Sequence, residues 1–365
     1  MKNKIPKVLH IDTGKAWRGG QQQVVYLLKG MLERGLDTAL VCQSKSELEK
    51  YCENHKLPYF PLRMRGEVDI VAGFRIALLC RKFKFRVLHL HTAHAMAIGL
   101  FARLFYPGLR LIAVRRVDFH IKKHVLSQFK YKTQLLDKIV CISDGIKQVL
   151  LQDGLSAEKL VTIHSGIDIR KFDQTKLPDD FRQNLNIPEG DVVIGTIAAL
   201  AGHKDYPNLL RAARIVLDQT KKVTFCAVGD GPDKNPIHKL ANELNLGDRF
   251  IFTGFRTDLG YFLKMFDIFV LASKKEGLGT SILDAQAVGL PVVGCDTGGI
   301  PEAVKHEQNG LLVPPKNEQA LANALLRLIE DISLRQKLGQ AGRHTVEQFS
   351  IERTINENIE LYQRL

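Results

Sequence analysis

The chain has 365 residues, of which 45% are hydrophobic and 25% are charged. These proportions are ordinary for a folded globular protein, and they exclude collagen-like, low-complexity and disordered chains. The formal net charge of +13 is compatible with an anionic partner. The distribution of that charge along the chain indicates which part would contact such a partner.

The terminal sequence and the cysteines narrow the class further. The segment Met1–Lys7 carries charge with no apolar run behind it, so we expect no signal peptide. No apolar stretch approaches the ~20 residues that a membrane-spanning helix needs. The six cysteines are scattered without a C-x-x-C pair, which predicts buried free thiols of a cytosolic protein rather than disulfides or a zinc site.

Positive charge is concentrated in the first half of the chain. Residues 1–170 hold 29 of the 52 Lys and Arg residues but only 14 of the 39 Asp and Glu residues, a surplus of 15 positive charges. The rest of the chain is almost neutral. This asymmetry favours an anionic partner that contacts the first half alone.

Short apolar runs alternate with helical patterns through this first half. A strand over residues 8–11 is followed by a glycine-containing loop and a helix over residues 22–34, which ends before Gly35, a typical C-terminal cap. Further strands are predicted at residues 38–42, 87–90, 111–114, 139–143 and 160–163. Strands separated by helices of about 10–15 residues indicate a parallel sheet covered on both faces.

A polar stretch between Asp168 and Glu189 predicts a domain boundary, after which the alternation resumes. Strands are expected at residues 192–198, 223–228, 249–253, 268–272 and 291–295, with helices over 207–220, 237–245 and 280–288. The predicted fold class is α/β, with two doubly wound Rossmann-like domains over residues 1–168 and 169–349. A final helix within residues 350–365 is expected to pack back on the first domain.

Polar and glycine-rich clusters follow the ends of almost all the predicted strands. Ligands of open parallel sheets bind beyond the carboxyl ends of the strands. We therefore expect the two sheets to face each other and to form one ligand-binding cleft between the domains.

The segment from Glu276 to Asp284 is the most informative of these clusters. Gly277 and Gly279 allow the main chain to approach a ligand, and Thr280 opens a helix whose free N–H groups suit a phosphate. Glu276 can accept hydrogen bonds from sugar hydroxyls, and Asp284, about one turn into the helix, can reach another hydroxyl pair. The alternative is an ordinary helix start with a solvated acid.

Other candidate residues also have plain structural alternatives. Lys204 follows a predicted strand and can neutralise a diphosphate, or it is a surface lysine. The pair Gly19-Gly20 is a phosphate-binding loop or a flexible turn. His91 and His94 are functional groups or histidines satisfied within their loop.

Taken together, these residues resemble glycosyltransferase family 4, the retaining nucleotide-sugar transferases of the GT-B architecture. The resemblance covers nearly the whole chain, and its later motifs are specific as a series. It rests on these segments: His10-Ile11-Asp12, Trp17-Arg18-Gly19-Gly20-Gln21, Ser165-Gly166-Ile167-Asp168, Lys204-Asp205, Val228-Gly229-Asp230-Gly231-Pro232, Phe252-Thr253-Gly254-Phe255, Glu276-Gly277-Leu278-Gly279 and Gly298-Gly299-Ile300-Pro301-Glu302. The sequence is most similar to bacterial transferases of lipopolysaccharide core or cell-surface glycans, which share the Trp-Arg-Gly-Gly and Arg-Arg-Val-Asp-Phe segments.

The resemblance implies a role for individual residues. Gly19 and Gly20 would close over the donor phosphates, and Lys204 would neutralise the leaving diphosphate. Glu276 would bind the donor sugar, and the amides of Leu278, Gly279 and Thr280 would bind the sugar and the phosphates. Asp284 would hold the ribose hydroxyls, and Phe255 with Arg256 would lie against the base. Gly229 and Gly277 would also belong to the donor-binding site.

Three departures from the family pattern bear on these roles. The second acid is Asp284 instead of the usual Glu, which makes the ribose contact looser or water-mediated. Ala199 stands where the family places an arginine, five positions before Lys204. The histidine common after the fifth strand is replaced by Arg115-Arg116, and we expect one of these arginines to supply the missing positive charge from across the cleft.

The resemblance also implies a metal-independent mechanism. The chain has no Asp-x-Asp, the usual metal-chelating spacing of the other large transferase architecture. Lys204, an arginine and helix-terminal amides would therefore meet the leaving charge, and the departing phosphate would take the acceptor proton. His91 or Asp118 is expected to assist, and the sequence does not choose between them.

Basic segments of the first half predict a peripheral location on the inner face of the cytoplasmic membrane. Lys122, Lys123, Lys130 and Lys132 form a basic helix beside apolar residues, and residues 81–86 interleave aromatics with cations. Such surfaces lie on anionic lipid or on a phosphorylated glycolipid. The alternative is a solvated helix face.

The predicted function is retaining transfer of a hexose-type sugar from a nucleotide-diphosphate sugar to a hydroxyl of a cell-envelope glycolipid or oligosaccharide, without a metal or other cofactor. A nucleotide-sugar epimerase of the same architecture and a non-catalytic scaffold remain alternatives. A nucleic-acid-binding protein fits the pI of about 9.4 but leaves the glycine loops unexplained.

Overall fold

The computed structural model describes residues 5–121 and 124–365 and divides the chain into two compact units. Unit 1 comprises Met1–Gly166 together with Ile351–Leu365, and unit 2 comprises Ile167–Ser350. The terminal helix is therefore part of the first unit, and the division falls two residues before the predicted boundary at residue 168. Each unit is described by itself.

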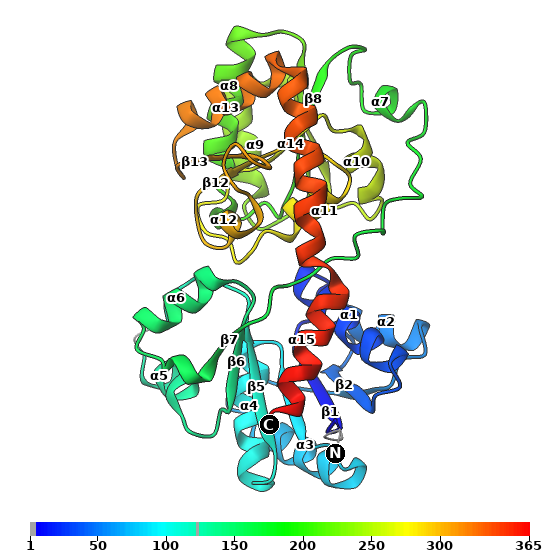
Figure 1. Cartoon of the computed structure of the whole chain (residues 1–365), viewed down its shortest axis with the longest axis vertical. Helices are drawn as coiled ribbons and strands as arrows, with labels where there is room; N and C mark the ends of the chain where they lie inside the picture. The colour runs from blue at the N-terminus through cyan, green and yellow to red at the C-terminus, as the bar shows by residue number, and fades with distance from the viewer. Residues whose placement is uncertain (1–4, 122–123) are drawn as a thin grey trace. The chain divides into compact units, whose positions relative to one another are not determined.

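Unit 1 is built on a parallel sheet that has seven strands in its described part, in the order β3-β2-β1-β4-β5-β6-β7 (Figure 1). The strands are β1 (Val8–Asp12), β2 (Thr38–Gln43), β3 (Tyr59–Leu62), β4 (Val87–Leu90), β5 (Arg110–Arg115), β6 (Lys138–Cys141) and β7 (Leu160–Thr162). The strand order reverses between β1 and β4, so the ligand-binding edge of a sheet of this type is expected there.

Helices connect these strands and cover the sheet. They are α1 (Gly19–Glu33), α2 (Glu47–Asn54), α3 (Ile70–Phe83), α4 (Ala93–Phe105), α5 (Val125–Lys132), α6 (Asp144–Gln152), η1 (Ala157–Lys159) and α15 (Ile351–Gln363). Serine, threonine and aspartate cap several of them: Ser46 accepts from the amide of Glu49, and Thr92 accepts from that of Ala95.

The terminal helix α15 is held in unit 1 by its apolar face. Ile355 and Tyr362 pack in one buried cluster with Val8 and Met31, which joins α15 to β1 and α1. A Cβ atom at Gly30 of α1 would lie 2.1 Å from Cδ1 of Ile355, so any larger residue there would displace the Ile355 side chain. The C-terminal sequence thus completes the core of the N-terminal unit.

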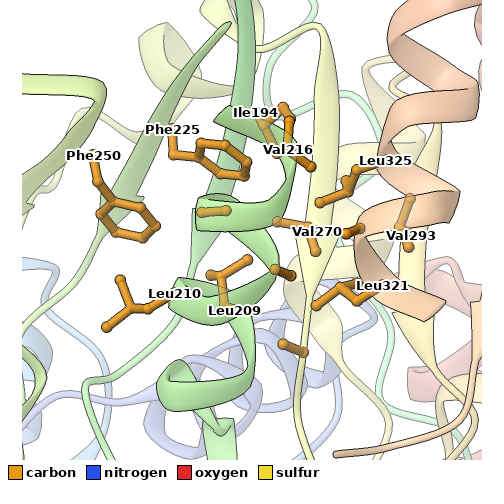
Figure 2. Packing of buried hydrophobic residues seen from close by; sticks show 14 of the residues in the cluster. Ile194, Leu209, Leu210, Val216, Phe225, Phe250, Val270, Val293, Leu321 and Leu325 are labelled. Carbon is orange, nitrogen blue, oxygen red and sulfur yellow. The ribbon is translucent and has the colours of Figure 1, made fainter. Parts of the chain in front are cut away.

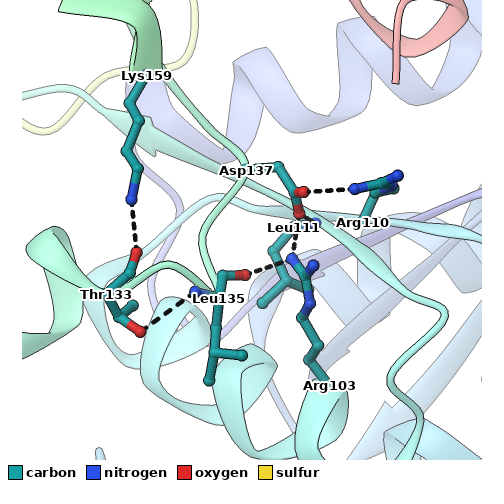
Figure 3. A network of polar contacts seen from close by, with 7 residues as sticks. All are labelled: Arg103, Arg110, Leu111, Thr133, Leu135, Asp137 and Lys159. Atoms are coloured by element: carbon teal, nitrogen blue, oxygen red, sulfur yellow. Dashed lines mark hydrogen bonds and ion pairs between the residues drawn. The ribbon is translucent and has the colours of Figure 1, made fainter. Parts of the chain in front are cut away.

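A polar network fastens α4 to the sheet (Figure 3). Asp137, in the turn before β6, pairs with Arg103 of α4, with Arg110 at 3.0 Å, and with the amide of Leu111 at 2.7 Å. The side chains of Arg103 and Asp137 are mostly buried. Because each buried charge has its partner, the network fixes the start of β5 and the end of α4 together.

Unit 2 contains a second parallel sheet, with six strands in its described residues in the order β10-β9-β8-β11-β12-β13. The strands are β8 (Val192–Ile197), β9 (Val223–Val228), β10 (Phe250–Gly254), β11 (Ile268–Leu271), β12 (Val292–Cys295) and β13 (Leu311–Val313). The helices are α7 (Phe181–Asn184), η2 (Gly202–Lys204), α8 (Tyr206–Gln219), α9 (Lys234–Glu243), η3 (Gly247–Arg249), α10 (Leu259–Met265), α11 (Thr280–Ala287), α12 (Ile300–Ala303), α13 (Glu318–Glu330), α14 (Ile332–Thr345) and η4 (Val346–Phe349). The order reverses between β8 and β11.

One large apolar cluster in the core of unit 2 lies between its sheet and the helices α8 and α13. Ile194 of β8 and Val270 of β11 pack with Leu209 and Val216 of α8 and with Leu325 of α13 (Figure 2). These strands are almost wholly apolar because a parallel sheet is buried on both faces. The prediction of two parallel-sheet α/β domains is therefore confirmed.

Two further expectations concern the whole chain. All six cysteines are buried and free, as their apolar contexts predict. Among the residues that the structure describes, no helix combines the length and the apolar character needed to cross a bilayer.

Candidate functional site

The sequence-predicted residues gather at the reversal point of each sheet. In unit 2, Lys204 follows β8 and Glu276 follows β11, the two strands at which the order reverses. In unit 1, the corresponding strands β1 and β4 are followed by Gly19 and by His91. Loops at the reversal point diverge and leave room for a ligand beyond the sheet.

Lys204 and Glu276, which are 72 residues apart, form an ion pair in unit 2. Lys204 closes the short helix η2, and the hydroxyl of Ser273 donates a second hydrogen bond to Glu276 Oε2 at 3.1 Å. Both charged side chains are mostly buried. An ammonium has three donors, so Lys204 can hold Glu276 and still donate to an anionic ligand.

The start of α11 lies next to this pair. Its N-cap, Gly279, has a φ of +82° and offers no side chain to the first-turn amides. Glycine adopts this left-handed conformation without strain, and a Cβ there would lie 3.2 Å from Cδ1 of Ile282. The first turn carries no acidic residue, so the positive end of the helix dipole is open to an anion. Leu278 is buried in the core, which leaves only its main chain for a ligand.

Asp284 lies half-buried on α11, one turn beyond Gly279. The pKa of its carboxyl is raised to about 6, chiefly by burial, while Lys171 lowers this pKa and nearby Asp168 raises it. Because that pKa lies below 7, the carboxylate is mainly ionised at neutral pH and can accept hydrogen bonds.

Three other predicted donor residues border the same edge of unit 2. Gly229 follows β9, and its amide donates to the carbonyl of Gly254 at 2.9 Å. Phe255 is 68% exposed, which suits stacking on a flat ring. Arg256 is bound in a bidentate pair to Asp258, at 2.9 and 2.6 Å, and lies over the ring of Phe262. Its guanidinium is thus fixed within its own loop.

In unit 1, the structure corrects the predicted placement of Gly19 and Gly20 in a loop before the helix, while their predicted role stays a prediction. Both residues lie in the first turn of α1, which begins three residues earlier than predicted. The side chain of Gln21 accepts from the amide of Arg18 at 3.1 Å and donates to Asp12 at 3.0 Å. These bonds fix the helix start despite its two glycines.

A chain of buried histidines runs behind this helix start. His10 of β1 and His89 of β4 are paired in register, and His91 follows two residues later on the same face. His91 Nε2 lies 3.0 Å from His10 Nδ1, and His89 Nδ1 lies 2.6 Å from the hydroxyl of Tyr362 in α15. Burial lowers the pKa of His10 to about 3 and lowers the pKa values of His89 and His91 well below their usual value. All three rings are neutral at pH 7.

Arg116 fixes the tautomers of two of these rings, His91 and His10. Its Nη2 lies 3.4 Å from His91 Nδ1 and its Nη1 donates to Ser165 Oγ at 3.2 Å. A guanidinium can only donate, so His91 Nδ1 accepts, His91 Nε2–H donates to His10, and His10 carries its proton on Nε2. Burial lowers the pKa of Arg116 to about 10, while Asp12 raises it, so the charge is retained.

The two adjacent arginines differ in their surroundings. Arg115 turns towards α5, where it donates to the hydroxyl of Tyr131 at 2.8 Å and to the carbonyl of Phe119. Arg116 instead borders a cavity of about 20 Å³, which has room for a single water molecule and is also lined by Gln23, His89, His91, Ser165 and Asn358. Of the two, Arg116 is the one placed at the reversal point of the sheet.

The histidine cluster is also a group whose geometry could hold a metal ion. One ligand atom from each of His10, His89 and His91 lies within 4.8 Å of the others. The pair His10–His91 is already hydrogen-bonded, and the guanidinium of Arg116 faces the cluster. Because like charges repel, this neighbour opposes a cation there.

The remaining predicted residues are dispersed. Asp118 is half-buried in the loop after β5, and His94 is exposed on α4 near Glu67. Lys132 is exposed, whereas Lys130 is buried and bonded to Glu67 at 2.7 Å. The predicted basic surface is thus corrected at Lys130, whose charge is already neutralised. Lys122 and Lys123 lie outside the described residues.

Sequence reasoning overlooked His89 and Tyr362 as part of this site. The signal was present for the histidine, because His91 follows β4 two residues after His89, a spacing that places both on the face of His10 in the neighbouring strand. Tyr362 gave no such signal, since only the return of α15 to unit 1 brings its hydroxyl to His89.

Comparison with known proteins agrees with this geometry. The family described as Glycosyltransferase Family 4 matches residues 17–171, and the family described as Glycosyl transferases group 1 matches residues 178–345. Together the two matches cover most of both units. The chain belongs to the glycosyltransferases.

Two curated glycosyltransferases align over nearly their full lengths. The Escherichia coli UDP-Gal:alpha-D-GlcNAc-diphosphoundecaprenol alpha-1,3-galactosyltransferase is 23% identical, over 98% of this chain and 96% of its own. The lipopolysaccharide core biosynthesis glycosyltransferase LpsE of Rhizobium meliloti is 27% identical, over 97% of this chain and 98% of its own. The first is named for galactosyl transfer to GlcNAc-diphosphoundecaprenol and the second for lipopolysaccharide core biosynthesis.

Solved structures of glycosyltransferases share the fold. A Rickettsia africae glycosyltransferase has a TM-score of 0.87 at 20% identity, covering 98% of each chain. Anabaena HepE in complex with UDP-glucose has a TM-score of 0.86 at 22% identity, covering 99% of this chain and 100% of its own. This glycosyltransferase therefore has the GT-B fold that its sequence predicted.

Proposed function

We propose that this glycosyltransferase transfers a hexose-type sugar, with retention, from a nucleotide-diphosphate sugar to a hydroxyl of an envelope glycolipid or oligosaccharide. The observation that carries the proposal is the group at the reversal point of unit 2: the Lys204–Glu276 pair beside the glycine-capped start of α11. A cation, an acid and open helix amides within one small edge match a sugar joined to a diphosphate.

Each part of this group has a task in the proposed reaction. Lys204 and the first-turn amides of α11 stabilise the charge that develops on the departing diphosphate. Glu276 accepts hydrogen bonds from the sugar hydroxyls, and Asp284 accepts them from the ribose. Phe255 offers its exposed ring to the base. Arg256 is tied to Asp258 and contributes through the shape of its loop.

In the proposed step, the acceptor oxygen forms a bond to the anomeric carbon while the bond to the diphosphate oxygen breaks on the same face. The acceptor proton passes to the departing phosphate oxygen. That His91 or Asp118 assists, that Arg116 supplies further positive charge, and that the edges of both units act on one ligand all remain predictions. Lys204 and the amides meet the leaving charge without a metal.

The acceptor is proposed from the relatives. One is named for a galactosyl transfer to a diphosphoundecaprenol-linked sugar and another for lipopolysaccharide core synthesis. An acceptor of this kind lies in a membrane, and unit 1 carries the positive charge that suits anionic lipid. We therefore propose a peripheral location on the inner face of the cytoplasmic membrane, with no nucleic acid partner.

Nucleotide sugars added singly in a thermal-shift screen test the donor. The correct donor at 100-fold over its dissociation constant should stabilise the protein by about 2.7 kcal/mol. Incubation of that donor with membrane glycolipid should then yield a glycosylated product in EDTA. A requirement for Mg²⁺ or Mn²⁺ would refute the metal-free mechanism. Formation of an epimer from the donor alone would show that the protein is a nucleotide-sugar epimerase and would refute the proposed transfer.

A further inference from the structure

Helix α3 of unit 1 is apolar on two opposite faces. Its buried face carries Ala72, Ile76 and Cys80, and Gly73 brings it so close to α4 that a Cβ there would lie 2.6 Å from Phe101 Cβ. The other face carries Ile70, Val71, Phe74 and Leu78, all of which are exposed. We call these four residues the α3 ridge. Their spacing places them on one stripe of a helix.

The α3 ridge continues onto the end of α4. The ring of Phe74 meets that of Phe105 edge-on at a centroid distance of 5.3 Å, and Leu104 beside it is 60% exposed. The exposed apolar side chains of α3 are not required for the core of unit 1, because the opposite face of the helix makes the core contacts. Contiguous apolar patches of this kind mark contact with a partner or a membrane.

The charge around the ridge is strongly positive. Residues 63–86 contain seven Lys and Arg residues and two acids. Both acids are engaged: Asp69 accepts from the amide of Ala72 at 2.9 Å as the cap of α3, and Glu67 bonds Lys130. Arg75, Arg81 and Lys82 lie on the exposed side of α3 and flank the ridge.

We propose that the α3 ridge inserts into an anionic membrane surface while the cations beside it bind the lipid phosphates. The inference rests on the proposed function, because it states how unit 1 reaches a membrane-bound acceptor. It also moves the contact from α5, where Lys130 is already neutralised by Glu67, to α3. A second copy of the chain is disfavoured as the occupant, because a symmetric contact would bring the cations of both copies together.

The experiment measures co-sedimentation of the full chain with two kinds of vesicle, phosphatidylcholine alone and phosphatidylcholine mixed with phosphatidylglycerol in equal parts. We expect binding to the mixed vesicles only, weakened by salt. The triple variant Ile70→Ser/Val71→Ser/Leu78→Ser should lose at least about tenfold in affinity, since each apolar side chain loses its burial. Arg75→Gln/Lys82→Gln should lose about fivefold for each charge removed.

Matched controls lie elsewhere in the chain. Ile332→Ser removes an exposed apolar side chain from α14, Lys239→Gln removes an exposed cation from α9, and both should bind vesicles like the parent protein. Val125→Ser/Phe129→Ser on α5 tests the alternative surface and should retain most of the binding. Equal binding to both kinds of vesicle, or loss of binding in the α5 variant alone, would overturn the proposal.

Two further measurements separate this inference from the proposed function. Unchanged melting temperature and unchanged nucleotide-sugar binding in the ridge variants show that the fold and the donor site are intact. A ridge variant that binds vesicles normally removes the membrane inference and leaves the transferase in place. A dimer in light scattering that the ridge substitutions dissociate would identify a second copy as the occupant and overturn the proposal.

Discussion

The two units share one architecture but present different surfaces. Of the large hydrophobic side chains found exposed in the described residues, twelve belong to unit 1 and two, Phe255 and Ile332, to unit 2. Unit 1 places neutral histidines at its reversal point, whereas unit 2 places a charged pair beside an open helix start. The same fold thus carries a basic half with exposed apolar side chains and a half with a charged pair beside an uncapped helix start, because these features lie in loops and on exposed helix faces.

The largest expected effect concerns the buried histidines of unit 1. Each has a pKa depressed in the folded state, so it binds a proton more readily when unfolded, and its contribution to stability is lost as pH falls below 6.5. Three such groups should together cost the fold about 4 kcal/mol between pH 7.5 and pH 5.5. Asp12, whose pKa is raised by burial, opposes this trend at lower pH.

Hydrogen exchange of the amides of β1 and β4 between pH 7.5 and 5.5 measures this loss in unit 1 alone. The variant His89→Gln should flatten the dependence, and His55→Gln, at an exposed position, should not. If the amides of β9 and β11 in unit 2 lose as much protection from hydrogen exchange over this pH range, the predicted difference in pH-dependent stability between the two units is wrong.

The next effect tests the charged pair of unit 2. Lys204→Ala should lower kcat by roughly a hundredfold to a thousandfold, because one preorganised donor to the leaving diphosphate is removed. Lys239→Ala, on the exposed side of α9, is the matched control. Steady-state kinetics with the donor found in the thermal-shift screen measure the effect of each variant on kcat and KM. A change in KM with kcat preserved would show that Lys204 acts in binding only.

A stability effect of similar size is expected in unit 1 at the network of Figure 3. Asp137→Ala leaves Arg103 mostly buried without its carboxylate, and we expect a loss of about 3 kcal/mol in the free energy of unfolding. Asp218→Ala, in an exposed pair with Arg214, should change it by less than about 0.5 kcal/mol. Urea denaturation of both variants gives the comparison, and equal losses would contradict it.

The smallest effect concerns Asp284. Its pKa of about 6 predicts that donor affinity declines as pH falls from 7 to 5, since the protonated carboxyl no longer accepts two hydrogen bonds. Asp284→Asn should weaken binding by about 1 kcal/mol and remove this pH dependence, and Asp284→Glu should tighten binding by restoring reach. Calorimetric titration with the donor across that range tests both, and a parental pH profile in the Asn variant would exclude Asp284 from the site.

Most of the fold could be predicted because parallel strands are buried on both faces and therefore read as apolar runs. The strand at 87–90 and that at 223–228 are observed with the predicted bounds. β3 and β13 were missed: both are short edge strands, and β3 contains Pro61, which breaks the pattern of a strand. Glycine is a poor helix former, so the start of α1 at Gly19 depends on the bonds of Gln21.

The sequence by itself determined the alternation of strands and helices, the charge asymmetry and the glycine-rich loops, because these are local properties of the chain. Only the tertiary structure decided which distant residues meet: Lys204 with Glu276, and His10 with His91 and Arg116. It also decided that Lys130 is neutralised by Glu67 and that the second face of α3 stays uncovered. Strand order and helix packing set these contacts, and neither is encoded in the periodicity of a single segment.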